Sequence, residues 1–168
     1  MIINGQSLLR AKPIEEMETE KIRFQGTSYG LSEAGYDIRI KQDVTFIKDA
    51  FGDRVTVREP DGTEETFFGS FCLASSIEAF DMPRNLVGVV HDKSTWARKA
   101  LSVFNTVIEP GWIGKCLTLE LVFHGSGVLH IPAGAGIAQV LFHSLVEEGD
   151  YGDGKYQNAH DRPQPALE

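Results

Sequence analysis

The sequence predicts an all-β fold, a barrel, sandwich or jelly roll with one or two short helices. The main evidence is a series of short segments in which apolar residues alternate with polar ones or form β-branched runs, as in strands of a packed sheet. Clusters of turn residues separate these segments, and stretches with helical periodicity are few. Strands that do not alternate with helices argue against a parallel βαβ architecture.

Length and composition indicate one domain. The chain has 168 residues, of which 42% are hydrophobic, which is enough for a core that needs neither disulfides nor metals. We expect residues 1–148 to form the β domain and the polar residues 149–168 to form a C-terminal tail. Composition alone leaves open whether this tail is ordered or a frayed terminus.

Charge and cysteine content exclude some classes of function. The net charge of −8 argues against nucleic-acid binding, which needs a basic face, but a few local cations could still bind a small anion. Cys72 and Cys116 lie in apolar runs, as free core thiols do in a reducing compartment. The sequence shows neither a long apolar segment nor a leader-like start, so we expect a cytoplasmic protein that does not enter a membrane.

The first half of the chain predicts four strands and one helix. The strands are expected at residues 36–46, 53–59, 66–75 and 86–90. In the first of these, Tyr36, Ile38 and Ile40 alternate with charged residues and should share a buried face. Residues 60–62 (PDG) supply a turn, and residues 4–11 (NGQSLLRA) favour a short helix.

The second half predicts four more strands. They are expected at residues 101–108, 117–123, 128–131 and 136–145. Turn residues separate them, most clearly at 110–112 (PGW), where Pro110 presets φ and Gly111 supplies conformational freedom.

A short helical turn with a cationic character, residues 94–100 (STWARKA), interrupts this strand pattern. Ser94 or Thr95 is expected to be its N-cap, and Ser94 and Arg98 are four residues apart and share a face. The start of a helix offers unpaired N–H groups, and together with Lys93 and Arg98 it could bind a polyphosphate. An ordinary solvated turn is the alternative interpretation.

A carboxylate in the strand at 117–123 is the second candidate site. Alternation places Glu120 on the face opposite to the leucines. It faces either solvent or a cavity, and in a cavity desolvation would raise its pKa and suit it to general acid–base catalysis near neutral pH. Glu109 lies at the entrance of the PGW turn.

These motifs, in this order, resemble those of the dCTP deaminase family within the dUTPase-like superfamily. The matching segments are SEAGYDIRI (32–40), LVGVVHDKSTWAR (86–98), IEPGWIG (108–114), LTLEL (117–121), GIAQVLF (136–142) and KYQ (155–157). The similarity covers most of the chain, and its strength lies in the colinearity of several independent motifs.

The resemblance implies a distorted jelly roll or β-barrel of the β-clip type. It also implies a homotrimer with three sites at subunit interfaces, in which residues 149–168 form a lid over the site. The residues that it places in contact with a deoxycytidine nucleotide are Lys93, Ser94, Thr95, Arg98, Glu109, Thr118, Leu119, Tyr151 and Lys155. Of these, Glu109 would lie beside the sugar, Tyr151 and Lys155 would serve the lid, and the backbone of Thr118 and Leu119 would contact the base.

The implied reaction is hydrolytic deamination of dCTP to dUTP and ammonia. Glu120 would activate the water, Ser94 would assist it, and Arg98 would position Ser94 and offset negative charge. Most nucleobase deaminases use zinc held by an HxE…PCxxC set, and the five histidines and two cysteines form no such pattern. We therefore expect no catalytic zinc and no side chain that binds a metal directly, with Mg²⁺ bound through the triphosphate of the substrate.

Four departures from the family pattern leave alternatives open. The segment between Arg98 and the PGW turn is about two residues shorter than in the family, and Ala159 stands where the family has a glutamine. Asp92-Lys93 stands where the family has an arginine, and a carboxylate there must either face away from the phosphates or reach the Mg²⁺. One extra residue at 115–116 must be absorbed, for instance by a β-bulge, or Glu120 would point to the wrong face. The alternatives are a dUTP diphosphatase, alone or combined with deamination, and a catalytically inactive nucleotide-binding module.

Overall fold

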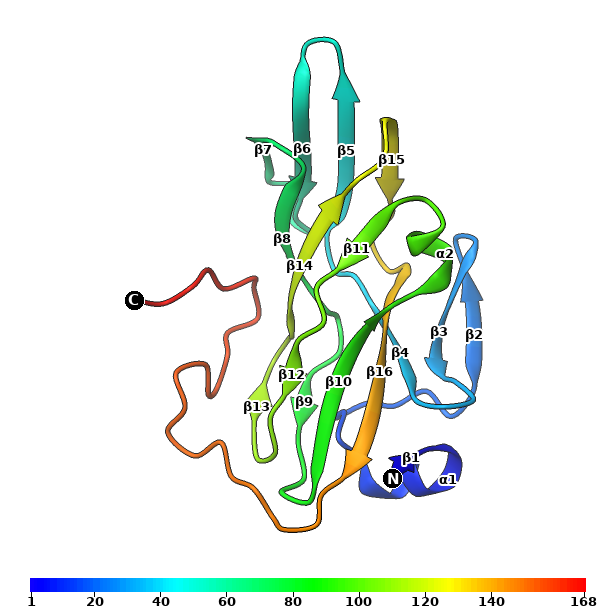
Figure 1. The fold of residues 1–168 in the computed structure, drawn as a ribbon, viewed down its shortest axis with the longest axis vertical. Helices are drawn as coiled ribbons and strands as arrows, with labels where there is room; N and C mark the ends of the chain where they lie inside the picture. Colours follow the sequence, from blue (N-terminus) through cyan, green and yellow to red (C-terminus); the bar gives the residue numbers. More distant parts are fainter.

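The computed structural model describes residues 1–168 and confirms a mostly β architecture with two short helices (Figure 1). The helices are α1 (Gly5–Ala11) and α2 (Ser94–Ala97). The strands up to the middle of the chain are β1 (Ile2–Ile3), β2 (Lys21–Phe24), β3 (Thr27–Leu31), β4 (Tyr36–Arg39), β5 (Asp43–Asp49), β6 (Gly52–Arg58), β7 (Glu64–Phe68), β8 (Phe71–Ser75) and β9 (Phe80–Asp81). The remaining strands are β10 (Leu86–Asp92), β11 (Leu101–Val103), β12 (Val107–Ile108), β13 (Ile113–Gly114), β14 (Thr118–Phe123), β15 (Gly127–Ile131) and β16 (Gly136–Ser144).

These strands form four antiparallel sheets around one core. The largest sheet runs in the order β12-β10-β16-β4-β3-β2, with β1 added to β16. A sheet in the order β15-β5-β6-β7 packs beside it, and β14 is the central strand of the sheet β11-β14-β8. The strands β13 and β9 form a short pair of their own.

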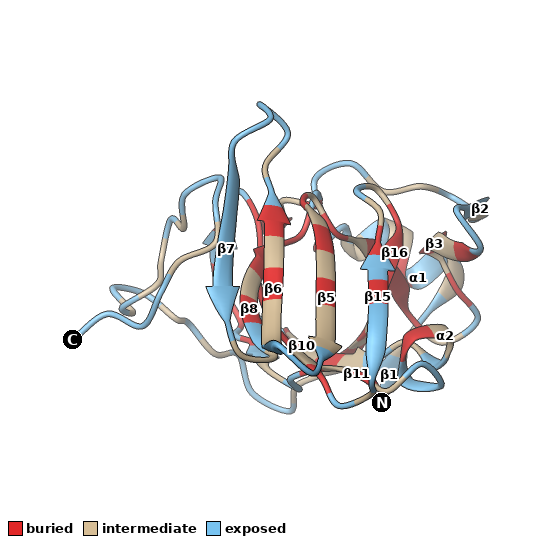
Figure 2. Cartoon of the chain, turned by 90° about the horizontal axis from the view of Figure 1, so that it is seen from above, coloured by how far each residue is buried: buried red, intermediate tan, exposed pale blue.

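The core confirms the alternation that the sequence shows. Tyr36, Ile38 and Ile40 are fully buried, as expected for one face of a strand. Figure 2 shows buried positions along β5 and β6, whereas every residue of β7 is exposed. The edge strand β7 therefore extends the sheet by backbone pairing with β6 but places no side chain in the core.

Three predicted strands are wrong in extent, because in each of them the chain passes from one sheet to another. The segment 36–46 divides into β4, which pairs with β16 and β3, and β5, which pairs with β15 and β6. The segment 66–75 divides at Gly69, which adopts a φ of +105°, into β7 and β8. The segment 101–108 divides into β11, which pairs with β14, and β12, which pairs with β10.

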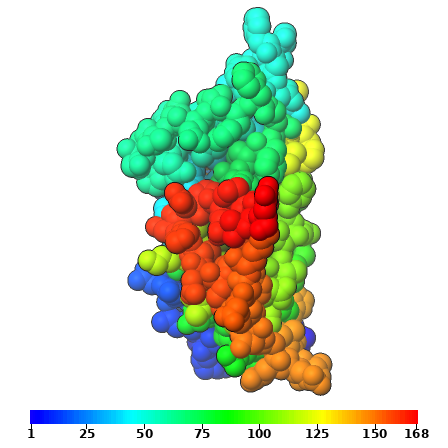
Figure 3. Space-filling view, turned by 90° about the vertical axis from the view of Figure 1, so that its left-hand side faces the viewer, coloured from blue at the N-terminus to red at the C-terminus, as the bar shows by residue number.

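The C-terminal tail is packed along the sheet strands and is not frayed. Figure 3 shows residues of the tail, coloured orange to red, covering the lower and middle part of one face of the molecule. The tail holds the segment around β13 through backbone contacts, because Asn158 N–H donates to Ile113 O at 2.9 Å and Lys115 N–H donates to Ala159 O at 3.2 Å. The indole of Trp112 donates to Tyr156 O at 2.7 Å.

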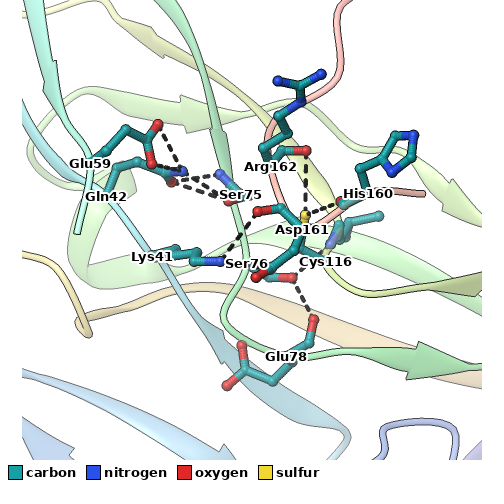
Figure 4. A network of polar contacts seen from close by, with 11 residues as sticks. Lys41, Gln42, Glu59, Ser75, Ser76, Glu78, Cys116, His160, Asp161 and Arg162 are labelled. Atoms are coloured by element: carbon teal, nitrogen blue, oxygen red, sulfur yellow. Dashed lines mark hydrogen bonds and ion pairs between the residues drawn. The ribbon is translucent and has the colours of Figure 1, made fainter. Parts of the chain in front are cut away.

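Side chains of the β domain fix the next part of the tail (Figure 4). Lys41 Nζ lies 2.6 Å from the carboxylate of Asp161. The thiol of Cys116 donates to the backbone oxygens of His160 and Arg162 at 3.2 and 3.5 Å. The tail is therefore held by an ion pair and a thiol in addition to its backbone contacts.

Candidate active site

The central strand β14 carries the candidate catalytic carboxylate. Leu119, Leu121 and Phe123 are buried in the core, while Thr118 and Glu120 lie half-buried on the opposite face, so the predicted alternation is confirmed. Hydrogen bonds on both sides hold the strand, which pairs with β8 and accepts the N–H of Phe104 at the carbonyl of Glu120. The register of Glu120 is thus fixed from two directions.

Glu120 lines a cavity of about 690 Å³. Its Oε2 atom is buried and has no hydrogen-bond partner in the chain. Burial raises the pKa of Glu120 above its usual value, because water no longer stabilises the charged form. A buried acceptor without a partner requires an explanation in a folded protein, and a ligand that donates a hydrogen bond there supplies one.

Three more of the predicted site residues lie around the same cavity. Glu109, Thr118 and Tyr151 line it together with Glu120. The side chain of Leu119 is buried in the core, so only its backbone could face a ligand. Lys155 is exposed and does not line the cavity.

The cationic turn lies elsewhere within the single chain. None of residues 93–98 lines the Glu120 cavity, and Figure 1 shows α2 and the tail on opposite sides of the molecule. Ser94 and Arg98 are exposed. A single chain therefore brings together Glu109, Thr118, Glu120 and Tyr151, but not the residues of α2.

The start of α2 corrects one local prediction and gives the Asp92 carboxylate a partner within the chain. Lys93 is the N-cap residue, with an extended backbone and no capping hydrogen bond from its side chain, so neither Ser94 nor Thr95 is the N-cap. Asp92 Oδ1 accepts a 2.7 Å hydrogen bond from Val103 N–H. The Asp92 carboxylate is thus tied to β11.

The extra residue at 115–116 is not absorbed by a β-bulge. Residues 115–117 connect β13 to β14, and the ladder between β14 and β8 runs without a shift from Thr118 to Val122. The linker takes up the additional length, so the side chain of Glu120 keeps its face.

The sequence did not single out several residues that complete the cavity. These residues are Phe71, Leu73, Thr106, Val107, Ile108, Trp112, Cys116, Leu117, Tyr156, Ala159, Gln164, Pro165 and Ala166. Gln164 N–H donates to the hydroxyl of Thr118 at 3.0 Å, which brings the end of the tail next to Glu120. The sequence signals for this lining are the segments IEPGWIG and KYQ, which contain Ile108, Trp112 and Tyr156. Pro163 and Pro165 are a further signal, since proline favours the extended backbone that can lie along a strand.

The structure contains no group of three or more His, Cys, Asp or Glu side chains that could hold a metal ion. Both cysteines are free and buried, as the sequence predicts. Burial raises the pKa of Cys72 to about 12, so that thiol stays protonated at neutral pH. No helix is long and apolar enough to span a membrane.

A comparison with known protein families matches residues 8–145 to the family described as dCTP deaminase-like. The chain belongs to the dCTP deaminase-like family. Curated relatives agree with this assignment. The chain is 34% identical to a dCTP deaminase of Gemmatimonas aurantiaca, over 92% of this chain and 90% of the relative. It is 36% identical to a dCTP deaminase of Roseiflexus castenholzii, over 86% and 85%.

Solved structures similar to this dCTP deaminase-like protein are dUTPases. The dUTPase of Staphylococcus bacteriophage 80alpha has a TM-score of 0.54 and 14% identity over 86% of this chain and 97% of the phage protein. The EIAV dUTPase has a TM-score of 0.50 and 16% identity over 86% and 95%. At this identity the likeness concerns the fold, and it confirms the predicted dUTPase-like β architecture.

Proposed function

We propose that this protein deaminates dCTP, or a related deoxycytidine nucleotide, to the corresponding deoxyuridine nucleotide and ammonia. The observation that carries the proposal is Glu120, which lines a nucleotide-sized cavity and whose buried Oε2 has no hydrogen-bond partner in the chain. Membership in the dCTP deaminase-like family supports the choice of reaction. A cytosine ring in the cavity would supply the donors that this carboxylate lacks.

The mechanism begins with the ionised Glu120. The carboxylate removes a proton from a water molecule, and the resulting hydroxide attacks C4 of cytosine. Glu120 delivers this proton to the ring nitrogen N3, where it stays. Glu120 then takes the proton of the new C4 hydroxyl and delivers it to the amine, so that the C4–N4 bond breaks as the C4 carbonyl forms and ammonia leaves. Proton transfer by a positioned side chain contributes about 10²–10⁴-fold to such a rate, and Ser94 and Arg98 assist in the proposal by orienting the water and offsetting negative charge.

We propose a homotrimer in which the α2 turn of a neighbouring subunit completes each Glu120 cavity. The support is the separation of these two elements within one chain, together with the free side chains of Ser94 and Arg98. Exposed apolar side chains near the cavity, namely Phe71, Phe104 and Val107, also favour a protein contact there. In this arrangement Ser94, Thr95 and Arg98 approach the phosphates, and Glu109 approaches the sugar.

We propose that residues 149–168 act as a lid over the cavity. Tyr151 and Tyr156 line the cavity from the tail, and the exposed Lys155 is free to contact the phosphates once a nucleotide is present. Mg²⁺ would be held by the triphosphate oxygens, because the chain offers no cluster of acidic side chains to bind it. The ion would neutralise phosphate charge and takes no part in the proton transfers. A cytoplasmic location fits this role in nucleotide metabolism.

Two alternatives remain specific enough to test. A dUTP diphosphatase would use a carboxylate to direct water at the α-phosphorus, with Glu109 as the candidate. The dUTPase-like fold is the observation that favours it. An inactive nucleotide-binding module would keep the cavity and lack turnover.

Incubation of the protein with dCTP and with dUTP, each with Mg²⁺, separates the three possibilities. The proposal expects ammonia and a deoxyuridine nucleotide from dCTP. Pyrophosphate from dUTP would indicate the diphosphatase, and both products would indicate a combined activity. Saturable binding of dCTP without release of ammonia would contradict the proposal and indicate the inactive module.

A further inference from the structure

We propose that Lys93 is a positioning residue that fixes the α2 turn through Asp37, and that it does not bind the phosphates of the substrate. This inference rests on the proposed deaminase function and revises the role that the family resemblance implies for Lys93. It assigns recognition of the phosphates to the neighbouring exposed groups, above all to Arg98.

The first observation is where the ammonium of Lys93 lies. Lys93 Nζ forms an ion pair with Oδ2 of Asp37 and donates a 3.2 Å hydrogen bond to the hydroxyl of Ser28. The side chains of Lys93 and Asp37 are only 11% and 3% exposed. The charge of Lys93 is therefore turned into the protein.

The second observation is that the Asp37 carboxylate has no other full charge in contact with it. Its other hydrogen-bond partners are the hydroxyl of Ser28 and the amide of Gln139, at 3.4 and 3.2 Å. A buried carboxylate is stable only when it is paired and hydrogen-bonded, and removal of one partner of a buried pair is costly. A phosphate could recruit Lys93 only by leaving Asp37 buried without a counter-charge.

The third observation is the direction of the following residues. Lys93 has an extended backbone, with φ −85° and ψ 126°, and successive side chains in extended chain point to opposite sides. With Lys93 turned inward, Ser94 is turned to the surface, and Arg98 follows one helical turn later. The inward-turned Lys93 is thus followed by side chains that α2 presents to the surface.

Two further contacts support the same turn. Asp92 accepts the N–H of Val103, and the indole of the buried Trp96 donates to Gly136 O at 2.7 Å. Residues 92, 93 and 96 therefore attach α2 to three different strands, and residues 94 and 98 are the ones left free. Lys93 belongs to the anchoring set.

The test compares Lys93→Gln, Asp37→Asn and the double variant in the turnover of dCTP and dCMP. The inference expects each single substitution to lower kcat/KM by about 10- to 100-fold, since a small misplacement of catalytic groups has effects of this size. The kcat/KM of the double variant should be no lower than that of either single variant. In all three variants, the ratio of dCTP to dCMP turnover should stay within about twofold of the wild-type ratio. Lys93→Arg, which keeps the charge, should retain most of the activity.

A phosphate-binding Lys93 predicts a different pattern. Lys93→Gln would then lower the turnover of dCTP more than that of dCMP, so the ratio of the two turnovers would become smaller. Asp37→Asn would release the ammonium of Lys93 and leave the turnover of dCTP unchanged or raised. That result would overturn the inference. Arg98→Gln is the matched comparison and is measured by binding, because loss of a phosphate contact should raise the Kd for dCTP more than the Kd for dCMP.

Folding and the proposed function are checked separately. The double variant removes both charges together and should unfold at a temperature closest to that of the wild type, so that a loss of activity in it is not a loss of structure. If the wild type binds dCTP without deaminating it, the proposed function fails. The same comparison is then made on the Kd values for dCTP and dCMP and still decides the role of Lys93.

Discussion

Glu120 shows at the scale of one residue how a strand position becomes reactive. The alternation of β14 turns it away from the core and into the lining of a cavity, where one of its oxygens is buried without a hydrogen-bond partner. Desolvation raises the pKa of Glu120, which brings a carboxylate closer to the pH at which it can both accept and return a proton.

Substitution Glu120→Gln should abolish most of the proposed activity. It removes the proton acceptor at nearly constant volume, and kcat for dCTP is expected to fall by at least about 100-fold, measured as ammonia release. Glu65→Gln is the matched control, because Glu65 is a strand glutamate on the exposed β7 and should keep wild-type kcat. Comparable losses in both variants would contradict the assignment of Glu120.

The same substitution should stabilise the fold. A carboxyl group whose pKa is raised in the folded state favours folding below its unfolded pKa, and that advantage is lost as the pH rises through the folded pKa. The amide introduced by Glu120→Gln is neutral at every pH, so this variant should unfold about 2–4 °C higher than wild type at pH 8, which corresponds to about 1 kcal/mol.

The difference in unfolding temperature should shrink toward zero near pH 4, close to the ordinary pKa of glutamate. Thermal unfolding followed by circular dichroism from pH 4 to pH 8 measures it. A variant less stable than wild type at pH 8 would indicate that Glu120 has a partner in the folded protein.

The burial and orientation of single side chains were predictable only where the local sequence pattern determines them. Alternation predicted the face of Glu120, and the apolar context predicted the buried thiols. The ion pair between Lys93 and Asp37 joins positions 56 apart in sequence. It depends on β4 and β10 both lying next to β16, which local patterns do not reveal.

At the scale of elements, the tail is held by contacts that differ in strength. The ion pair between Lys41 and Asp161 is partly exposed, so its contribution is modest. The buried thiol of Cys116 and the backbone contacts beside β13 complete the attachment. If the tail acts as the proposed lid, these are the contacts that must break when it opens.

Substitution Lys41→Gln should loosen the tail. An exposed ion pair contributes about 0.2–1 kcal/mol, so cleavage by trypsin after Lys155 should become up to about fivefold faster. Mass spectrometry of the fragment 1–155 measures the rate. The control is Lys48→Gln, whose ion pair lies within the β5–β6 hairpin, and equal rates in both variants would exclude a role of Lys41 in the tail.

The existence of most strands was predictable, but their boundaries were not. Alternation continues across 36–46, although β4 and β5 belong to different sheets. The alternation of apolar and polar residues predicts which face of a segment is buried. It does not predict which other strand pairs with that segment. The order of the tail was left open for the same reason, since its partners are far away in sequence.

At the scale of the whole molecule, the proposal requires more than one chain. Within one chain, no residue of the turn at 93–98 lines the cavity with Glu120. A cyclic trimer would place one against the other three times. Family membership and the dUTPase-like fold were predictable at this scale, because several motifs occur in the expected order along the chain.

Co-expression of Glu120→Gln and Arg98→Gln chains tests this shared site most directly. Each variant alone should form inactive trimers, whereas random mixing in a cyclic trimer gives about one quarter of the sites both an intact Glu120 and a neighbour's intact Arg98. Mixed trimers separated from the homotrimers each carry one such site out of three, so they should release ammonia from dCTP at about one third of the wild-type rate. Mixed trimers as inactive as the single variants would show that no site combines Glu120 of one chain with Arg98 of the next.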